Sequence, residues 1–355
     1  MSKLFSPIKI RSLELRNRIA VSPMCQYSAK DGIPNDWHFV HLGSRAVGGA
    51  GLVFTEATAV SPEGRISPAD TGIWSDEHTK AWGRIAGFVK SHGAAVGIQL
   101  AHAGRKASTK TPWEGEGEVT LTNGGWQTIG PSPVKFSDDY PLPKEMSKTD
   151  IRIVIDQFAG AAKNSLAAGF QIAEIHSAHG YLLHQFLSPL SNRRKDEYGG
   201  ELKNRMRFPL EVAKAVRETW APDLPVFIRI SSTDWIEGGW DLAQSIEYAK
   251  ELKKTGIDLI DCSSGGVAPG AKIPISPGYQ VQFAEGIKRQ AGIMTGAIGL
   301  ITEATQAENI LADGKADVII MARELLRDPY FPLHAARALG DDPQYPKQYS
   351  RAKPK

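Results

Sequence analysis

The chain is poor in cysteine, and this lack narrows the classes of protein to which it can belong. Cys25 and Cys262 are its two cysteines among 355 residues, so we expect no disulfide framework, and this chain alone cannot build a four-cysteine iron–sulfur site. No apolar run approaches the ~18 residues that a membrane span needs. The first ten residues include Lys3 and Lys9 and lack the apolar stretch of a signal peptide. We therefore expect a cytoplasmic protein that does not enter a membrane.

The sequence also lacks a large excess of charge of either sign. Its 42 basic and 39 acidic residues leave a formal net charge of +3, which is too small to predict binding to nucleic acid. Low-complexity linkers and repeats are absent too. The hydrophobic fraction of 41% is ordinary for a globular protein and can supply a large core. We expect a single domain over residues 1–355, because α/β barrels of ~250 residues or more form one domain.

Short apolar runs rich in β-branched residues alternate with longer amphipathic stretches along the chain. The predicted strands are residues 18–21, 51–56, 94–100, 171–175, 226–230, 259–262, 293–295 and 318–321. The clearest predicted helices are residues 149–168, 204–219, 242–255, 279–290, 302–312 and 330–339. Gly169 and Gly256 stand where a helix C′ glycine belongs, and Thr302 is a candidate N-cap. Eight βα units favour an α/β fold with a closed (β/α)₈ TIM barrel over an open doubly wound sheet, which usually has fewer strands.

Residues 109–140 interrupt this alternation after the third predicted strand. The segment is rich in Gly, Pro, Thr and Trp, which are not the residues of a regular helix or of a buried strand. We expect a long loop over the mouth of the barrel, with a small hairpin in it. Loops of this length are usually functional or disordered.

The barrel hypothesis makes a specific demand, because catalytic groups should follow the C-terminal ends of the strands. Polar, small and titratable residues do follow the predicted strand ends. In chain order they are Ser22, Pro23, Met24, Cys25, Gln26 and Tyr27; Glu56 and Ala57; Gln99 and His102; His176, His179 and Tyr181; Arg229; Ser263 and Ser264; Gly296 and Gly299; and Ala322 and Arg323. Chance would scatter such residues over both ends of the barrel. We therefore expect one functional site at this end.

The last two strand ends are consistent with a phosphate site. Gly296 and Gly299 allow close approach of the backbone to a ligand, and Arg323 follows the eighth strand. Phosphate sites of barrels commonly use the loops after strands seven and eight together with a helix N-terminus. The alternative is that the glycines serve turns and that Arg323 is a surface charge, and these residues alone leave both interpretations open.

His176 and His179 are three residues apart, so on a helical turn they would share a face. Two neutral imidazoles can donate hydrogen bonds to one oxygen atom, or they can bind a metal ion. A metal site would need a third ligand, and no acidic residue or further histidine is obviously placed at the neighbouring strand ends. The pair could also be one core histidine and one solvent-exposed histidine, although Tyr181, two residues on, favours a functional role.

The two cysteines differ in their positions. A free cysteine is most often a small buried hydrophobe, and we interpret Cys262 in this way. Cys25 stands at the end of the first predicted strand, which favours a place in the site. Because nothing near it in the sequence would activate a thiolate, we interpret Cys25 as a packing or tuning residue rather than as a nucleophile.

Together these residues resemble the old yellow enzyme family, most closely its short-chain, thermophilic-like branch. That branch includes xenobiotic reductases and ene-reductases of the NADPH dehydrogenase type. The resemblance covers nearly the whole chain and is carried by Leu-Arg-Asn-Arg-Ile (15–19), Ser-Pro-Met-Cys-Gln-Tyr (22–27), Gly-Ile-Trp-Ser-Asp-Glu-His (72–78), Gln-Leu-Ala-His-Ala-Gly-Arg-Lys (99–106), His-Ser-Ala-His-Gly-Tyr-Leu (176–182) and Phe-Leu-Ser-Pro-Leu-Ser-Asn-Arg-Arg-Lys-Asp-Glu-Tyr-Gly-Gly (186–200). Six segments in the right order are far more specific than one short motif.

The resemblance implies a (β/α)₈ barrel with an N-terminal capping hairpin and with non-covalent FMN over the strand ends. Gln99 would hydrogen-bond the pyrimidine part of the flavin, and Arg229 would stabilise negative charge on its N1 side. Ala322 stands where the family usually has glycine, so a backbone contact there requires a negative φ. The implied FMN contacts are Ser22, Pro23, Met24, Cys25, Ala57, Gln99, Arg229, Gly296, Gly299, Ala322 and Arg323.

The resemblance further implies an enzyme that reduces FMN with NADPH or NADH and then reduces an enone. His176 and His179 would donate hydrogen bonds to the carbonyl oxygen and stabilise the developing enolate. Flavin N5 would deliver hydride to the β-carbon of the α,β-unsaturated carbonyl (or nitro) compound, and Tyr181 would protonate the α-carbon. Tyr27 would line the substrate pocket. The resemblance implies no metal.

In this branch an arginine near the C-terminus can reach the site of a partner subunit, and Arg351 is the matching position. We therefore expect a homodimer or a dimer of dimers in which Arg351 contacts the substrate. Three rival hypotheses are a metal-dependent hydrolase on the same barrel, a non-catalytic flavin-binding barrel, and a relative of the dienoyl-CoA reductases. The last of these needs cluster cysteines that the sequence lacks.

Overall fold

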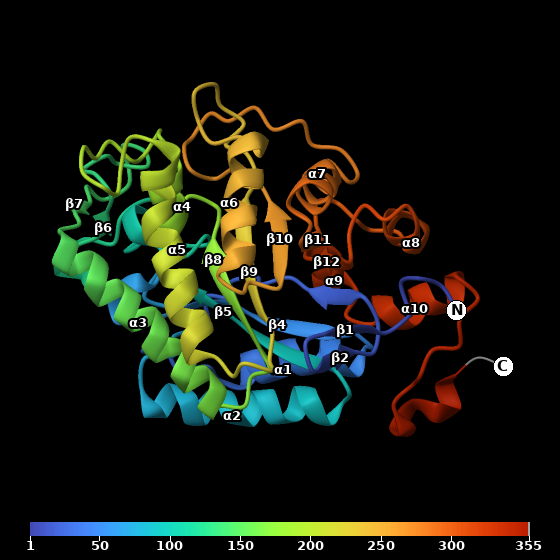
Figure 1. The fold of residues 1–355 in the computed structure, drawn as a ribbon. Helices are drawn as coiled ribbons and strands as arrows, with labels where there is room; N and C mark the ends of the chain where they lie inside the picture. The colour runs from blue at the N-terminus through green and yellow to red at the C-terminus, as the bar shows by residue number, and fades with distance from the viewer. Residues whose placement is uncertain (354–355) are drawn as a thin grey trace.

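The computed structural model describes residues 1–353 and contains a closed barrel of parallel strands (Figure 1). The strands follow one another around the barrel in chain order. They are β3 (Ile19–Val21), β4 (Leu52–Ala59), β5 (Ala95–Ala101), β8 (Ile172–Ser177), β9 (Val226–Ser231), β10 (Leu259–Ser263), β11 (Met294–Ala297) and β12 (Val318–Met321). The (β/α)₈ prediction is confirmed and the open sheet is wrong. Each predicted strand coincides with one of these strands.

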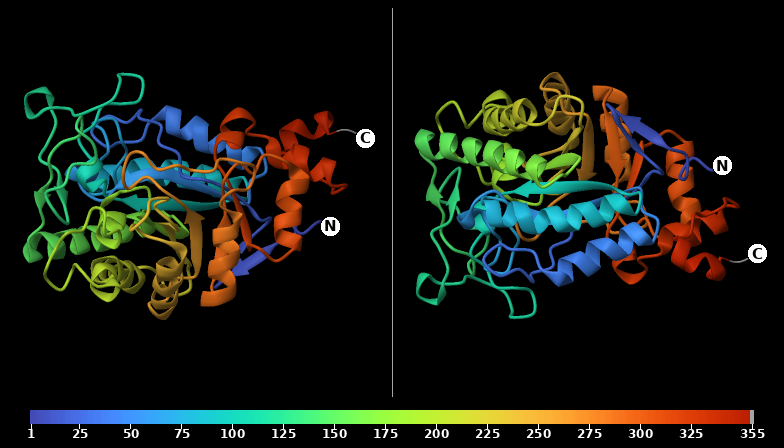
Figure 2. Two further views of the ribbon diagram at one scale, coloured as in Figure 1. Left: turned by 90° about the horizontal axis from the view of Figure 1, so that it is seen from above. Right: turned by 90° about the horizontal axis from the view of Figure 1, so that it is seen from below.

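Helices surround the barrel and bury the outer face of its strands (Figures 1 and 2). All residues of β4, β5 and β8 are buried, because helices cover one face and interior side chains cover the other. The helices are α1 (Asp36–Val47), α2 (Asp76–Ser91), α3 (Lys148–Ala167), α4 (Leu182–Leu187), α5 (Leu202–Thr219), α6 (Leu242–Lys254), α7 (Val281–Ala291), α8 (Ala304–Ala312), α9 (Arg323–Arg327) and α10 (Phe331–Ala338). Short 3₁₀ turns are η1 (Pro62–Gly64), η2 (Gly104–Lys106), η3 (Leu121–Asn123) and η4 (Lys347–Ala352). No helix within residues 1–353 is long and apolar enough to cross a membrane.

The six clearest predicted helices are present as α3, α5, α6, α7, α8 and α10. Gly169 and Gly256 follow α3 and α6 in left-handed conformations, with φ of 86° and 89°, so their predicted roles at helix ends are confirmed. The predicted N-cap at Thr302 is wrong. The Gln306 side chain accepts a hydrogen bond from the Thr302 N–H at 3.1 Å, and α8 begins only at Ala304, after Glu303.

A hairpin of β1 (Ile8–Ile10) and β2 (Leu13–Leu15) closes the N-terminal end of the barrel. Ile8, Ile10 and Leu15 form one hydrophobic cluster with side chains at the starts of the barrel strands, among them Leu52 and Leu259. The predicted N-terminal capping hairpin is therefore present. The hairpin fills the end of the barrel opposite the predicted site. One end of the barrel is therefore closed by apolar packing, and the other is left for the site.

The segment of residues 109–140 is a long loop, as expected, but its hairpin is not regular. A single antiparallel bridge joins Thr109 and Glu118. The other pairing, between β6 (Ile129–Gly130) and β7 (Lys144–Glu145), is parallel and therefore cannot be a hairpin. Prolines account for the short strands, because Pro131 directly follows β6 and Pro143 directly precedes β7, and proline has no N–H to donate to a strand pair.

The hairpin gives a stability prediction. We expect Leu15→Ala to lower the free energy of unfolding by ~2–5 kcal/mol, because the substitution leaves a cavity where a fully buried side chain stood. Leu13→Ala, at a half-buried position of the same strand, is the matched control and should change it by less. Chemical denaturation measures both values. Equal effects of the two substitutions would show that β2 does not close the barrel in this way.

Candidate active site

A cavity of about 250 Å³ opens at the C-terminal ends of the barrel strands. Ser22, Pro23, His179, Arg229, Gly299, Ala322 and Arg323 are the predicted site residues that line it. They come from five different strand ends or the loops that follow them. The structure therefore brings together the predicted flavin-ring end and the predicted phosphate end in one continuous space. Its volume is close to the lower limit of the ~300–1,000 Å³ typical of ligand pockets.

Arg229 and Ser22 line this cavity, and buried polar and charged side chains of the barrel interior lie beside them; Gln99 belongs to that interior set and does not itself line the cavity. Arg229 Nε lies 3.0 Å from Asp261 Oδ2, and Arg229 Nη2 donates to Ser22 Oγ at 3.0 Å. Gln99 Nε2 donates to Glu174 Oε1 at 2.8 Å. Burial raises the pKa of both carboxyls, and Arg229 opposes that rise. The predicted residues Gln99 and Arg229 are thus held by two acidic residues to which the sequence interpretation gave no role.

The other end of the cavity is built from backbone turns and arginines. Gly299 has a φ of 114°, which favours glycine, and the loop from Ile298 to Thr302 forms part of the wall. Ala322 has a φ of −105°, so the negative φ required for a backbone contact by alanine is present. Arg323 and Arg327 also line this end. Glu324 lines this end too and pairs with Arg327, so it is the Arg323 guanidinium beside the backbone turn that suits an anionic group such as a phosphate.

Gly296 lies within β11 and is not itself one of the residues that line the cavity, although it adjoins the lining residue Ile320. A Cβ at this position would come within 2.4 Å of Ile320 Cδ1 in the barrel interior. The glycine therefore makes room for core packing. Its predicted contact with a cofactor has no counterpart among the cavity-lining residues.

The His176 imidazole is oriented by its own chain at the end of β8. The Ala178 N–H donates to His176 Nδ1 at 3.2 Å, so Nδ1 is an acceptor and the ring proton is on Nε2. Burial lowers the pKa of His176 well below its usual value, and Arg229 adds to this effect. His176 is therefore a neutral side chain with one N–H to donate.

His179 and Tyr181 lie beside His176. The His176 ring centroid is 5.2 Å from that of His179 and 4.9 Å from that of Tyr181. Burial also lowers the pKa of His179 well below its usual value, and His179 Nε2 is 2.7 Å from Ser263 Oγ. Ser263 lines the cavity as well, and its place at a strand end was the sequence signal for it. The structure thus assembles the three predicted catalytic side chains in one cluster.

The Tyr181 phenol is held in its protonated form. Burial raises the pKa of Tyr181 well above its usual value, and the nearby Cys25 and Tyr27 side chains raise it further. Lys106 Nζ lies 5.1 Å from the centroid of the Tyr181 ring and donates to the carbonyl oxygens of His179 and Gly266. Burial lowers the pKa of Lys106 to about 8. Lys106 belongs to the segment of residues 99–106 in the family motif but had been given no role.

Cys25, Tyr27 and Ala57 lie close to one another and form a wall beside the cluster of His176, His179 and Tyr181. Burial raises the pKa of the Cys25 thiol well above its usual value, and Asp70 and Glu56 raise it further, so the thiol stays protonated. This agrees with a packing or tuning role rather than a nucleophilic one. Tyr27 packs edge-on against Trp113 of the long loop, with ring centroids 5.8 Å apart. Met24 is half-buried and packs against the core.

Glu56 and His38 form a buried pair next to Cys25 and Tyr27. The sequence places Glu56 at a predicted strand end but does not identify its partner His38. Glu56 Oε1 lies 3.1 Å from His38 Nε2, and Glu56 Oε2 accepts the Gln26 N–H at 3.1 Å. The register of β4 against β5 shifts between Phe54 and Ala57, and such a bulge redirects side chains. Glu56 thereby fixes the backbone of the Cys25–Tyr27 segment. The position of Glu56 next to a strand end was the signal in the sequence that pointed to such a role.

Two further predictions from the sequence concern a metal site at the histidine pair and the role of Arg351 near the C-terminus. Among residues 1–353, no cluster of three or more His, Cys, Asp or Glu side chains could hold a metal ion, and the neighbours of the histidine pair are Tyr181 and Ser263. Arg351 is exposed in η4 and does not line the cavity of its own chain.

Comparisons with known proteins agree with this geometry. Residues 3–342 match the model of the NADH:flavin oxidoreductase / NADH oxidase family. An NADPH dehydrogenase of Geobacillus thermodenitrificans (strain NG80-2) is 50% identical over 350 residues, which cover 98% of each chain. A morphinone reductase superposes with a TM-score of 0.81 at 28% identity, covering 96% of this chain and 90% of the other.

A further solved structure, the old yellow enzyme homologue of Zymomonas mobilis, superposes with a TM-score of 0.81 at 26% identity and covers 99% of both chains. The family model spans nearly all of the sequence, and the relatives match over the whole barrel. The chain therefore belongs to the NADH:flavin oxidoreductase / NADH oxidase family, that of the old yellow enzymes, and is an oxidoreductase with FMN as its cofactor.

Proposed function

We propose that the chain is an NADPH-dependent ene-reductase that reduces the carbon–carbon double bond of α,β-unsaturated carbonyl or nitro compounds. The observation that carries this proposal is the cluster of neutral His176, neutral His179 and protonated Tyr181, in which the His176 ring lies 5.2 Å from that of His179 and 4.9 Å from that of Tyr181, and in which His179 lines the cavity. Such a cluster offers hydrogen bonds to one substrate oxygen and a proton to a nearby carbon. NADPH is proposed as the reductant because the similar Geobacillus protein is an NADPH dehydrogenase, and NADH is the alternative.

The residues of the cavity fit non-covalent FMN. Arg229 provides a fixed positive charge at the buried end, and Arg323 provides positive charge at the open end, where Arg327 is paired with Glu324. Ser22, Pro23 and Gln99 would hold the ring together with Arg229, and Gly299, Ala322 and Arg323 would hold the phosphate. When bound, FMN accepts two electrons from the nicotinamide cofactor and passes them to the substrate double bond.

In this proposal His176 and His179 bind the carbonyl oxygen of the substrate. A neutral imidazole N–H in a buried site is a strong donor to an oxygen that gains negative charge, and it need not give up its proton. His176 presents Nε2–H because Nδ1 is engaged by Ala178. The hydrogen bonds polarise the double bond and make the β-carbon electron-poor.

Tyr181 completes the proposed reaction as the proton donor to the α-carbon. The raised pKa means that its hydroxyl keeps its proton until a strong base, such as the developing enolate, lies beside it. Lys106, at 5.1 Å from the ring centroid, places a positive charge beside the phenolate that remains. Tyr27, in the neighbouring wall, would line the substrate pocket.

The histidine roles can be tested by separating the two half-reactions. With 2-cyclohexenone as substrate, we expect His176→Ala or His179→Ala to slow reoxidation of the pre-reduced enzyme by ~10²–10³-fold, because each removes one donor to the oxyanion. Anaerobic stopped-flow absorbance measures this rate. His334→Ala, an exposed histidine paired with Asp328, is the control and should not change it. Wild-type rates in the two site variants would refute the oxyanion role.

Tyr181→Phe tests the proton donor. Because this variant keeps the ring but loses the hydroxyl, we expect slower reoxidation by 2-cyclohexenone and an unchanged rate of flavin reduction by NADPH. The effect should be ~10²-fold or more, as for other general acids. Rapid-mixing measurements of both half-reactions decide the matter. If both rates fall equally, Tyr181 binds ligands in general and does not act as the acid.

We also propose a homodimer, or a dimer of dimers, in which Arg351 of one copy reaches the site of another. The exposed position of Arg351 away from its own cavity supports such a contact. We expect Arg351→Ala to raise the Michaelis constant for the enone with little change in flavin content. Steady-state kinetics and light scattering measure the two properties. Lys347→Ala, in the same exposed turn, is the matched control, and an unchanged Michaelis constant and assembly in Arg351→Ala would end this part of the proposal.

A further inference from the structure

We propose that the buried pair of His184 and Asp234 positions the catalytic cluster by holding the turn of His179 and Gly180. The pair lies behind the cluster, away from the cavity-lining residues, and nothing in the family motif assigns it a role. The inference rests on the proposed function, because it assumes that His179 and Tyr181 have to be aimed at a substrate. Two of the measurements below need no substrate and therefore test the pair independently.

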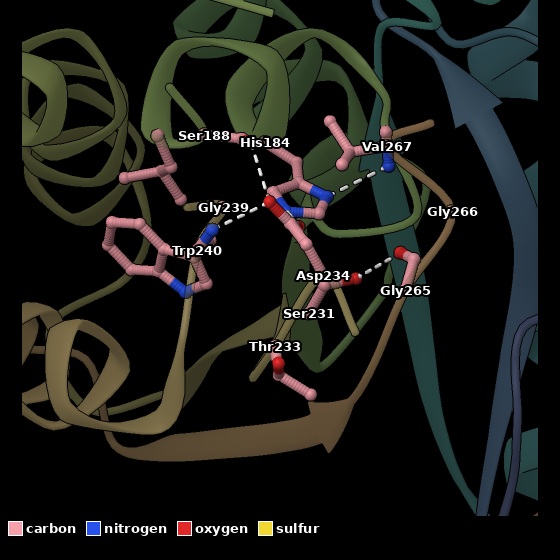
Figure 3. Close-up of polar contacts among 12 residues, drawn as sticks. His184, Ser188, Ser231, Thr233, Asp234, Gly239, Trp240, Gly265, Gly266 and Val267 are labelled. Carbon is pink, nitrogen blue, oxygen red and sulfur yellow. Dashed lines mark hydrogen bonds and ion pairs between the residues drawn. The ribbon is translucent and has the colours of Figure 1, made fainter. Parts of the chain in front are cut away.

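Figure 3 shows the pair and its surroundings. His184 Nε2, on α4, lies 2.9 Å from Asp234 Oδ1, in the segment that follows β9, and both side chains are fully buried. Asp234 Oδ2 accepts the Ser188 hydroxyl at 2.6 Å and the Trp240 N–H at 2.7 Å. Burial alone would raise the pKa of Asp234, but His184 and these hydrogen bonds outweigh it and lower that pKa. Asp234 is thus a buried carboxylate that accepts two hydrogen bonds at Oδ2 and has the imidazole of His184 within ion-pair distance of Oδ1.

The other nitrogen of His184 holds the catalytic turn. The Gly180 N–H donates to His184 Nδ1 at 2.9 Å, so Nδ1 carries no proton and Nε2–H faces Asp234. Gly180 stands between His179 and Tyr181 in the chain. A line of contacts therefore runs from Asp234 through one imidazole to the backbone that carries two of the three catalytic side chains.

This turn needs to be held, because its backbone is unfavourable. His179 has a φ of 58° and Gly180 a φ of 73°, and the left-handed region is rarely adopted by a residue with a Cβ. Gly180 also packs so tightly that a Cβ there would come within 2.1 Å of the carbonyl oxygen of Gly266. Without specific partners, the turn would relax toward ordinary backbone angles and move the His179 ring.

Each backbone polar group of the turn has a side-chain partner, and the partners come from β9, η2 and α4. The His179 N–H donates to Ser231 Oγ at 2.9 Å, and Lys106 Nζ donates to the His179 carbonyl at 2.9 Å. The Gly180 carbonyl accepts Gln185 Nε2 at 2.7 Å, and its N–H is the group held by His184. His184 is the member of this set whose hydrogen-bonding form is favoured by a buried charge.

The carboxylate of Asp234 favours the same tautomer of His184 that the Gly180 N–H requires. A carboxylate accepts at both oxygens, whereas asparagine would present an NH₂ group at one of them. If that NH₂ faced His184, the ring proton would have to move to Nδ1, where it would meet the Gly180 N–H. If it faced Trp240, it would meet the Trp240 N–H. Either way two donors would oppose each other in a buried place, which is strongly unfavourable.

The tautomer is measured by nitrogen-15 NMR of the FMN-loaded enzyme with labelled histidine. His184→Gln identifies the His184 signals by their absence. We expect the wild-type ring to be protonated at Nε2 and to show an unprotonated Nδ1. In Asp234→Asn this pattern should change to the other tautomer or to an exchange-broadened signal. A wild-type ring protonated at Nδ1 would overturn the proposal.

Hydrogen exchange and kinetics then test the consequence for the turn. We expect Asp234→Asn and His184→Leu to speed exchange of the Gly180 amide about tenfold or more and to slow enone reduction by about 10- to 100-fold. Glutamine offers one acceptor and one donor, so His184→Gln should restore most of both properties. His334→Gln, which alters an exposed His–Asp pair, is the matched control.

The outcomes separate a positioning role from a purely structural one. If Asp234→Asn lowers thermal stability but leaves Gly180 exchange and the enone rate of the folded enzyme unchanged, the pair is structural and the proposal is wrong. Where His184→Leu does not fold, Asp234→Asn and His184→Gln carry the test. If the tautomer and Gly180 exchange change as expected but the wild type reduces no enone, then the positioning of the turn stands and the proposed substrate class fails.

Discussion

The buried ion pair between Arg229 and Asp261 is the interaction on which the electrostatics of the site depend. Their residues are direct neighbours in the register of β9 and β10, so the guanidinium enters the barrel together with its counter-charge. A buried charge without a partner would be far less favourable. Arg229 adds to burial in lowering the pKa of His176 and His179, and it opposes burial at Asp261 and Glu174. Burial, reinforced by this one positive charge, thus keeps both imidazoles neutral, which is the state in which they are donors without a charge of their own.

Neutrality alone does not fix which nitrogen carries the proton, and here the backbone decides. Backbone N–H groups donate to Nδ1 of His102, His176 and His184 at 3.0, 3.2 and 2.9 Å. In each ring the proton is therefore on Nε2. For His176 this nitrogen is available for a substrate, and for His184 it faces Asp234. The same local hydrogen bond leaves an imidazole N–H available in His176, the proposed catalytic donor, and directs the one in His184 toward a carboxylate.

Much of the fold could be predicted from the sequence, because strands buried on both faces are continuous apolar runs and eight of them alternate with amphipathic stretches. The strand ends then brought His176, His179 and Arg229 to the same place, since parallel strands in a closed barrel end on one side. The partners of these residues could not be predicted. Glu56 with His38, and His184 with Asp234, are pairs between segments far apart in the chain, and no local pattern encodes such contacts. The irregular pairing of residues 109–140 escaped for the same reason.

The two buried histidine–carboxylate pairs each hold a loop that follows a barrel strand. Glu56 holds the Gln26 N–H in the segment with Cys25 and Tyr27, and His184 holds the Gly180 N–H. In both cases a buried carboxylate is stabilised by an imidazole, and the pair engages a backbone N–H of a loop that no regular strand could hold. Loops after barrel strands have to leave the ladder to reach a ligand, so they lose their backbone partners. A rigid polar pair behind each loop replaces those partners. Such a pair holds its loop best where water is excluded from the polar groups of the pair and of the loop. The apolar barrel, closed at its far end by the hairpin, excludes that water.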